Sequence, residues 1–443
     1  MKIRLAIAAL LLTVSTISQG QAVPAGGPSM TPVNSGINLS PLDGVVHYAL
    51  NASEIVQFGY YGTGEVTPST ALSGDVAYNA KSEVRPFSLL FAGGVLLGDQ
   101  SGQGTTTFWN VAVSQGFVTR SWVFNISDSF SFLPQSPTTG LSGIPGVGDL
   151  GALPVQGPGD GPAGGVFSDA GNRYINNVTG SVERQINHNT SISGNGSWAV
   201  LSFLNGGGDT NGAYNYSDVS GTAAVNRRID ARSSVSVGAA YSTFSYTQNG
   251  TGYLPPDFQT KGINVSYQRI LSRAFSVSIS GGPQWISSSN STLVPSRLNA
   301  AGSASLSYTR GLTSASAGYS HGANGGSGVL PGATSDNIYG SLAHTYSRNW
   351  VASLNVSYSH TAGLTQQTVG SSTVSTNEVY DTVYGGGQVT RRINTHFSAF
   401  ASYTAQNQTS NYTLPSQNAL NGTSQTFGIG ISFTPRSTRL GQF

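Results

Sequence analysis

The sequence predicts an all-β protein, a transmembrane antiparallel up-and-down β-barrel of about 18 strands with short turns at one end and long loops at the other. Three observations predict this fold. Arginines at short polar turns recur every 38 to 43 residues from Arg184 to Arg391. The segments between them alternate apolar with small polar residues, and aromatic residues recur at two levels along these segments. A repeat of this length holds two strands, a tight turn and a loop, which is the hairpin unit of such barrels.

The N-terminal segment is typical of a secretory signal. Lys2 and Arg4 precede an apolar run over residues 5–12, and small residues at 20–22 have the spacing of a cleavage site. We expect residues 1–22 to be a signal peptide and residues 23–54 to form an N-terminal periplasmic lead segment. The apolar run is too short to cross a bilayer as a helix.

Composition limits the classes of protein that fit this chain. Cysteine is absent, so we expect neither disulfides nor a lipid-modified cysteine anchor. Charged residues make up 9% of the chain, and Lys2 and Arg4 account for its formal net charge of +2. The mature chain is therefore neutral, and we expect no nucleic-acid partner.

Strand alternation extends over residues 55–434, which we expect to form the barrel. Phe275, Val277 and Ile279 share one face of their segment, and serines occupy the other. A period of two is a strand signal. In a membrane the apolar face meets lipid and the polar face lines the lumen. In a soluble β-sandwich the same apolar face would form the core.

The turn arginines give the strand count. Residues 55–61 and 426–434 add a first and a last strand to the sixteen that eight arginine turns join, which makes eighteen. An even count is required if both ends of the barrel lie in the periplasm. The segment 45–50 would be a further strand that breaks this parity, and sixteen strands remain an alternative. The turn arginines are Arg85, Arg120, Arg184, Arg227, Arg269, Arg310, Arg348 and Arg391.

Tyrosine placement favours the membrane over the sandwich. One set lies two residues before a turn arginine, and the other lies far along the following strand. Two such levels are expected of the aromatic girdles that flank the apolar band of a barrel. The first girdle comprises Tyr267, Tyr308 and Tyr346, and the second comprises Tyr319, Tyr358 and Tyr403.

Charges separate towards the two ends. Arginines gather at the short turns, which we expect to be periplasmic, with Arg269, Arg310, Arg348 and Arg391 as representatives. Acidic residues lie mostly in or next to the long loops, which would be extracellular. Avoidance of the apolar band explains this separation. A sharper hypothesis is that the acidic loop face attracts cations, and residues 206–211 would offer oxygens to calcium.

Enzymatic chemistry has little support in the sequence. Ser320-His321 and Ser359-His360 recur near the second girdle, and a barrel lipase would use a serine and a histidine at its lipid edge. Repetition of Tyr-Ser-His favours polar packing at the membrane interface instead. We find no phosphate-binding glycine loop and no clustered metal ligands. We expect no enzyme, no cofactor and no bound metal.

The hairpins resemble those of the outer-membrane β-barrel porins of Gram-negative bacteria. The resemblance rests on turns of the type Tyr-x-Arg or Thr-Arg and covers roughly residues 55–434. It implies a passive porin-like channel in the bacterial outer membrane. The turns that carry it are Tyr267-Gln268-Arg269, Tyr308-Thr309-Arg310, Tyr346-Ser347-Arg348 and Thr390-Arg391-Arg392.

The resemblance also bears on the longest loop and on the last strand. General porins fold their third extracellular loop into the lumen, so the Gly/Pro-rich loop 134–172 is a candidate constriction with Asp149 and Asp160 as its charged contacts. An external loop is the alternative. The final strand resembles the signal read by the barrel assembly machinery, with Phe433 as its last apolar residue. The tail 435–443 departs from that signal by adding two arginines before Phe443.

The leading functional hypothesis is passive diffusion of small hydrophilic solutes through a largely uncharged lumen of Ser, Thr, Asn and Gln. One alternative is a structural or surface-interaction barrel with an occluded lumen. Another is the outer-membrane component of polysaccharide export. The expected partners are outer-membrane lipid and lipopolysaccharide, the barrel assembly machinery and the solutes, and a homo-oligomer is compatible with this interpretation.

Overall fold

The protein is a closed antiparallel β-barrel. Its computed structural model describes residues 45–59, 66–80, 82, 84–99, 104–133, 172–204, 214–248, 255–326, 330–365, 367–369, 372–374, 378–411, 421–435 and 438–439. In this described part of the chain, no helix is long and apolar enough to cross a membrane.

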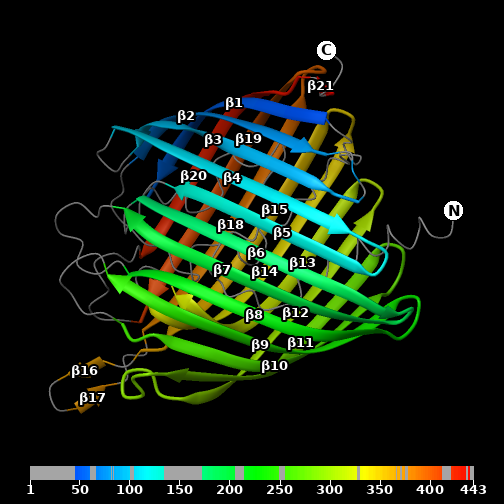
Figure 1. Cartoon of the computed structure of the whole chain (residues 1–443). Coiled ribbons are helices and arrows are strands. Elements are labelled where there is room, and N and C mark those ends of the chain that lie inside the picture. The colour runs from blue at the N-terminus through cyan, green and yellow to red at the C-terminus, as the bar shows by residue number, and fades with distance from the viewer. Residues whose placement is uncertain are drawn as a thin grey trace.

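The strands follow one another along the chain with antiparallel pairing throughout (Figure 1). They are β1 (Val45–Phe58), β2 (Val66–Asn79), β3 (Phe87–Asp99), β4 (Gly104–Val118), β5 (Trp122–Leu133), β6 (Asn172–Asn187), β7 (Thr190–Leu204), β8 (Tyr214–Arg228), β9 (Ser233–Gln248), β10 (Phe258–Ile270), β11 (Phe275–Ser288), β12 (Arg297–Arg310), β13 (Thr313–Gly326), β14 (Pro331–Ser347), β15 (Trp350–Gly363), β16 (Gln367–Val369), β17 (Ser372–Val374), β18 (Val379–Arg392), β19 (Phe397–Ser410), β20 (Gly422–Phe433) and β21 (Thr438–Arg439).

Pairing of the first strand with the last closes the barrel. β1 pairs with β2 along its whole length and, from Leu50 to Phe58, also with β20. Eighteen strands form the wall, because β16 and β17 pair only with each other and β21 adds two residues beside the start of β1. This confirms the predicted fold and the strand count of eighteen.

The start of the barrel needs a correction. The wall begins at Val45, ten residues before the expected boundary, so the expected lead segment 23–54 overlaps β1. Segment 45–50 is therefore the first part of β1 and not an additional strand, which removes the conflict with an even count. The physical reason is that residues 51–54 alternate without a glycine or proline to end the strand.

The two faces of the wall differ as a membrane barrel requires. In β20, Ile431 is 53% exposed and points outward, whereas the next residue, Ser432, which faces the lumen, is 1% exposed. Other outward apolar side chains, such as Leu50 and Ile263, are also exposed. Apolar groups outside and polar groups inside exclude the soluble sandwich, whose apolar faces would be buried. In the closed wall each of the eighteen described strands also pairs with a neighbour on both sides, as a barrel in hydrocarbon requires. The described wall therefore has the architecture of a transmembrane β-barrel.

Short turns join the strands at one end, and long loops join them at the other. In Figure 1 the short turns lie on the right. Polar side chains close several short turns locally. Asp230 Oδ1 accepts the backbone N–H of Arg232 at 2.6 Å, and Asn394 Oδ1 accepts that of His396 at 2.8 Å. Such side chains replace backbone partners in turns, which makes the short-turn end regular.

Candidate functional site

Small polar side chains line the lumen and bond to one another across strands. Ser280 and Ser303 lie 2.8 Å apart on β11 and β12, and Ser316 and Ser341 lie 2.6 Å apart on β13 and β14. Asn195 donates to Thr222 across β7 and β8 at 3.2 Å. Cross-strand hydroxyl and amide pairs stabilise a sheet without placing charge on its surface. The wall therefore presents a neutral, hydrogen-bonding surface.

Charged side chains on the lumen face are few and deeply placed. Asp75 on β2 is 1% exposed, Asp218 on β8 is 2% exposed and Arg173 on β6 is 8% exposed. Among the described residues, both carboxylate oxygens of Asp75 and the Nε of Arg173 lack a hydrogen-bond partner. Glu183 faces the same side of β6 as Arg173 and is less buried. These four are ionisable side chains of the lumen face.

An apolar cluster lies inside the barrel at the long-loop end. Phe244 on β9 and Phe258 on β10 are stacked with ring centres 4.5 Å apart, and Tyr216 and Tyr246 lie beside them. Val294, from the connection between β11 and β12, is 2% exposed and packs into the cluster. The complete buried cluster is Ile175, Leu201, Phe203, Tyr216, Phe244, Tyr246, Phe258, Ile286, Val294, Ala323 and Leu364. This apolar lining narrows one side of the mouth.

The hairpin tip, residues 322–326 of β13 and 330–332 at the start of β14, joins this cluster. Pairing between β12 and β13 stops at His321, five residues before β13 ends. Tyr246 Oη donates to the carbonyl of Gly325 at 3.0 Å, and a Cβ on Gly325 would lie 2.7 Å from the Tyr216 ring. β8 is five strands from β13, or roughly 24 Å along the wall. The tip therefore folds inward across the mouth.

Glycine is required where the tip meets the aromatic rings. Gly332 has φ +71°, and its Cβ would lie 2.8 Å from Phe258 and 3.3 Å from Leu364. Side chains rarely adopt that backbone conformation. The backbone N–H of Leu364 donates to the Gly332 carbonyl at 3.0 Å, which ties the segment after β15 to the tip.

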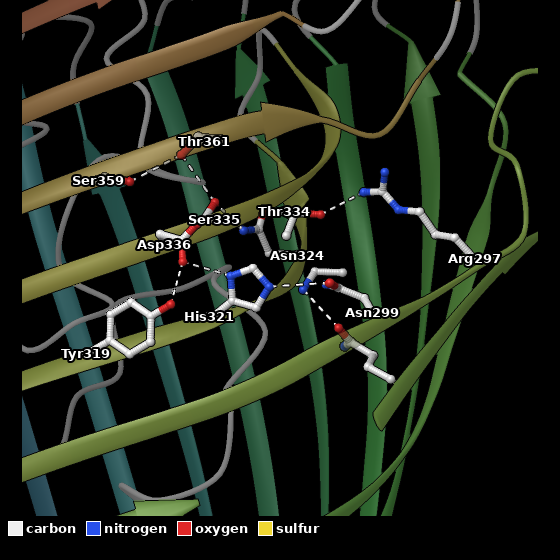
Figure 2. A network of polar contacts seen from close by, with 12 residues as sticks. Arg297, Asn299, Tyr319, His321, Asn324, Thr334, Ser335, Asp336, Ser359 and Thr361 are labelled. Carbon is white, nitrogen blue, oxygen red and sulfur yellow. Dashed lines mark hydrogen bonds and ion pairs between the residues drawn. The ribbon is translucent and has the colours of Figure 1, made fainter. Parts of the chain in front are cut away.

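Polar side chains bridge the gap that the tip leaves between β12 and β13. Figure 2 shows Arg297 and Asn299 reaching from β12 towards the β13–β14 hairpin. Arg297 donates to Thr334 at 2.8 Å, and His321 Nε2 lies 3.4 Å from Asn299 Oδ1. Hydrogen bonds between side chains thus replace the missing strand pairing at this place.

Two Tyr-His-Asp groups link neighbouring strands next to the gap. Asp336 on β14 accepts from Tyr319 at 2.6 Å and from His321 Nδ1 at 2.8 Å (Figure 2). Asp381 on β18 accepts from Tyr358 and His360 at the same distances. Asp336 is also the cross-strand partner of His360. The repeated Tyr-Ser-His of the sequence therefore serves cross-strand bonding, and Ser320 and His321 lie on opposite faces of β13, as successive strand residues do.

The predicted tyrosines lie on the outer wall. Tyr267, Tyr308 and Tyr346 lie near the short turns, and Tyr346 is 69% exposed. Tyr319, Tyr358 and Tyr403 lie in the far parts of their strands. Each of these three donates a hydrogen bond, to Asp336, Asp381 and Gln425 respectively.

The eight turn arginines are exposed and lie at or beside the short turns. Arg184 and Arg391 stack over Trp122 and Trp350, with guanidinium carbons 5.1 and 5.3 Å from the ring centres. The sequence pattern located these arginines but not their indole partners, which lie on the neighbouring strand.

Several of the predicted acidic residues have partners. Asp257 accepts the backbone N–H of Tyr246 at 3.0 Å, and Asp336 is bonded as described. Tyr380 donates to Glu378, whose carboxyl pKa is raised by burial. Asp149, Asp160 and the proposed calcium segment 206–211 lie outside the described residues. Among the described residues, no group of three or more His, Asp or Glu side chains is arranged to hold a metal ion.

No protein-family model and no curated protein matches the chain. Solved structures with a similar fold include OccK2 (OpdF) from Pseudomonas aeruginosa, at 11% identity and a TM-score of 0.43, covering 89% of this chain and 98% of that chain. The outer membrane protein opdK from Pseudomonas aeruginosa has 8% identity and a TM-score of 0.40, covering 89% and 99%. The siderophore receptor PirA from Acinetobacter baumannii has 9% identity and a TM-score of 0.41, covering 88% and 80%. At these low values, no solute, ligand or mechanism carries over to this chain.

Proposed function

We propose that the protein is a passive outer-membrane channel for small hydrophilic solutes. The observation that carries the proposal is the neutral, hydrogen-bonding lumen wall within a closed barrel of eighteen strands. Barrels of 16 to 18 strands are wide enough to hold an aqueous channel. A wall of hydroxyls and amides replaces part of a solute's hydration without binding it tightly, as passage requires.

The proposed selectivity follows from the lumen charges. The buried Asp75, Asp218 and Arg173 lie on separate strands of the wall, and the cross-strand contacts described above are between hydroxyls and amides. We therefore expect weak selectivity among ions and preference for uncharged solutes such as sugars. In the proposed orientation the short turns and their arginines face the periplasm, and the narrowed mouth faces outward.

Single-channel conductance of folded residues 23–443 in a planar bilayer tests the proposal. In potassium chloride we expect stable conductance steps and, across a salt gradient, a reversal potential close to zero. Arg173→Gln should shift the reversal potential towards cation selectivity, whereas Asp75→Asn should shift it towards anions. Liposome swelling with a neutral sugar is the matching solute assay. If the conductance steps had the same reversal potential in the wild type and in both variants, the current would not pass through this lumen.

A second candidate is a barrel that is occluded at its mouth and acts through its outer surface. It is favoured by the burial of lumen-facing side chains near the inward tip, such as Tyr216 at 2% exposed. A protein shown to be folded and inserted that gives no conductance would select this candidate. Conductance that appears only when the tip is displaced would identify a gated channel.

A further inference from the structure

The outer wall carries an apolar groove over strands β4 to β8. Its volume is about 600 Å³, and Phe117, Phe124, Ile126 and Val182 form its sides. Its floor is bare backbone, because Gly180 on β6 pairs with Gly196 on β7. Apart from its two chain neighbours, no described residue has an atom within 4 Å of the position that a Cβ on Gly180 would occupy. The groove therefore results from missing side chains on a face otherwise covered by apolar groups.

The guanidinium of Arg184 lies at the short-turn end of this groove and is held in place by an aromatic ring. Arg184 is the cross-strand partner of Trp122, and its guanidinium lies 5.1 Å from the ring centre. The next outward pairs along the same two strands are Phe124 with Val182 and Ile126 with Gly180. Four residues separate Arg184 from Gly180, roughly 13 Å along the strand. One continuous path thus leads from an exposed charge at the girdle into the apolar groove.

We propose that this path binds an anionic glycerophospholipid, with its phosphate on Arg184 and one acyl chain in the groove. The guanidinium matches a phosphate in charge and in fork geometry. Trp122 holds the guanidinium at headgroup level, where tryptophan is favoured. The acyl chain covers Phe124, Ile126 and the glycine floor. The choice of a glycerophospholipid rests on the proposed orientation, in which the short turns reach the periplasmic leaflet, and it does not depend on conduction.

The described part of the chain contains a matched cation–indole pair whose neighbouring glycines are covered by side chains. Arg391 stacks over Trp350 in the same cross-strand relation, at 5.3 Å. Above this pair, however, the Leu354 and Val356 side chains lie 3.6 and 3.7 Å from the Cβ positions of Gly387 and Gly385. The cation is the same, but its neighbouring glycines are covered. Arg391 is therefore the control for Arg184.

Native mass spectrometry of the folded protein in detergent, titrated with phosphatidylglycerol or with phosphatidylcholine of identical chains, tests the proposal. We expect a phosphatidylglycerol complex that is tighter than the phosphatidylcholine complex. Arg184→Gln should weaken it about tenfold, the change expected when one charge-assisted hydrogen-bonding partner is lost. Arg391→Gln should leave it unchanged. Gly180→Leu fills the groove and should weaken binding of both lipids.

Folding of each variant is checked by heat-modifiable gel mobility. Gly180→Leu adds an apolar side chain where open space is available, so we expect it to fold. It therefore tests the proposal even if Arg184→Gln misfolds. Equal binding of the two lipids by the wild type would overturn the proposal. Equal loss in Arg184→Gln and Arg391→Gln would also overturn it. Tighter binding of lipid A than of phosphatidylglycerol would assign the groove to lipopolysaccharide, and loss of a dimer in Gly180→Leu without loss of lipid would assign it to a second copy of the chain.

Discussion

The two ends of the barrel are built by different kinds of contact. At the short-turn end, partners lie within one turn or in the next turn along the wall: the Ile229 N–H donates to the Ser233 carbonyl at 2.9 Å, and the Arg228 N–H donates to the Asn189 carbonyl at 2.8 Å. At the long-loop end, Tyr246 on β9 donates to Gly325 on β13, which lies 79 positions later and four strands away. The first end is closed by contacts between adjacent hairpins, and the second is closed by residues from strands on different parts of the wall.

The short-turn end is a regular repeat, whereas the mouth is the part of the barrel that we expect to affect conduction. A local turn can be repeated eight times around the rim, and the backbone hydrogen bonds of each copy reach no further than the next turn along the wall among the described residues. The mouth is a single assembly in which the tip, the aromatic cluster and the segment after β15 depend on one another. Contacts of long sequence separation carry a larger entropic cost and form cooperatively. We therefore expect substitutions at the mouth to change both stability and conductance, and substitutions at the rim to have small local effects.

The largest expected effect comes from removing Phe258. Its ring is 3% exposed and stacked on Phe244, so Phe258→Ala should cost about 3–5 kcal/mol, as for other buried aromatic residues. The loosened tip should become sensitive to protease. The measurement is the urea midpoint of unfolding, with limited proteolysis of the native barrel.

Phe91→Ala is the matched control for Phe258→Ala. Phe91 is 47% exposed on the lipid side of β3, and detergent or lipid replaces the contacts that it loses. We expect a clearly smaller change in the urea midpoint and no new cleavage in the tip. Equal effects of the two substitutions would mean that the aromatic cluster does not hold the mouth.

A smaller effect is expected from Gly332→Ala. The positive φ of Gly332 and the 2.8 Å approach of its Cβ position to Phe258 make this position intolerant of a side chain, with a cost of about 1–3 kcal/mol. The tip should move away from β10, and the unit conductance should rise. Gly322→Ala, where the nearest atom is 3.9 Å away, serves as the control in the same hairpin. An unchanged conductance in Gly332→Ala would remove the tip from the conduction path.

The same contrast explains what the sequence could predict. Alternation and turn residues are local, so the strands, their count and both faces of the wall followed from patterns such as that of 275–279. The early start of β1 was missed because its first residues lie beside β2 and the two-residue β21, before Leu50 meets the last wall strand β20. The inward tip could not be predicted from local sequence. The residues that require Gly325 and Gly332, Tyr216 and Phe258 respectively, are distant in sequence and lie next to them only in the fold. Among the candidate site residues, the arginines were located, but the tryptophan partners required the register.

Removing one hydrogen bond at the mouth should have a still smaller effect. Tyr246→Phe keeps the ring and removes only the bond from its hydroxyl to the Gly325 carbonyl, which should cost about 1 kcal/mol. We expect more frequent conductance fluctuations in single-channel records. Tyr241→Phe removes a comparable bond to Gln259 on the outer face of the same strand and should leave those records unchanged. Similar records for both variants would argue against control by the mouth.

The smallest effect is expected at the rim, in the turn between β8 and β9. The Arg232 backbone N–H donates to Asp230 and holds the pKa of that carboxyl below its usual range. Because the folded-state pKa is lowered, this contribution to stability is present at neutral pH and is lost as pH falls below about 4 through the folded-state pKa. Asp230→Asn copies the equivalent turn with Asn394, whose amide oxygen accepts the same kind of bond without titrating. Thermal unfolding between pH 7 and pH 3 should therefore show a slightly weaker pH dependence in the variant, with conductance unchanged. If the wild type and the variant had the same pH dependence of unfolding, the Asp230 carboxylate would contribute nothing to the stability of the turn. If the variant changed the conductance, the rim and the mouth would be coupled.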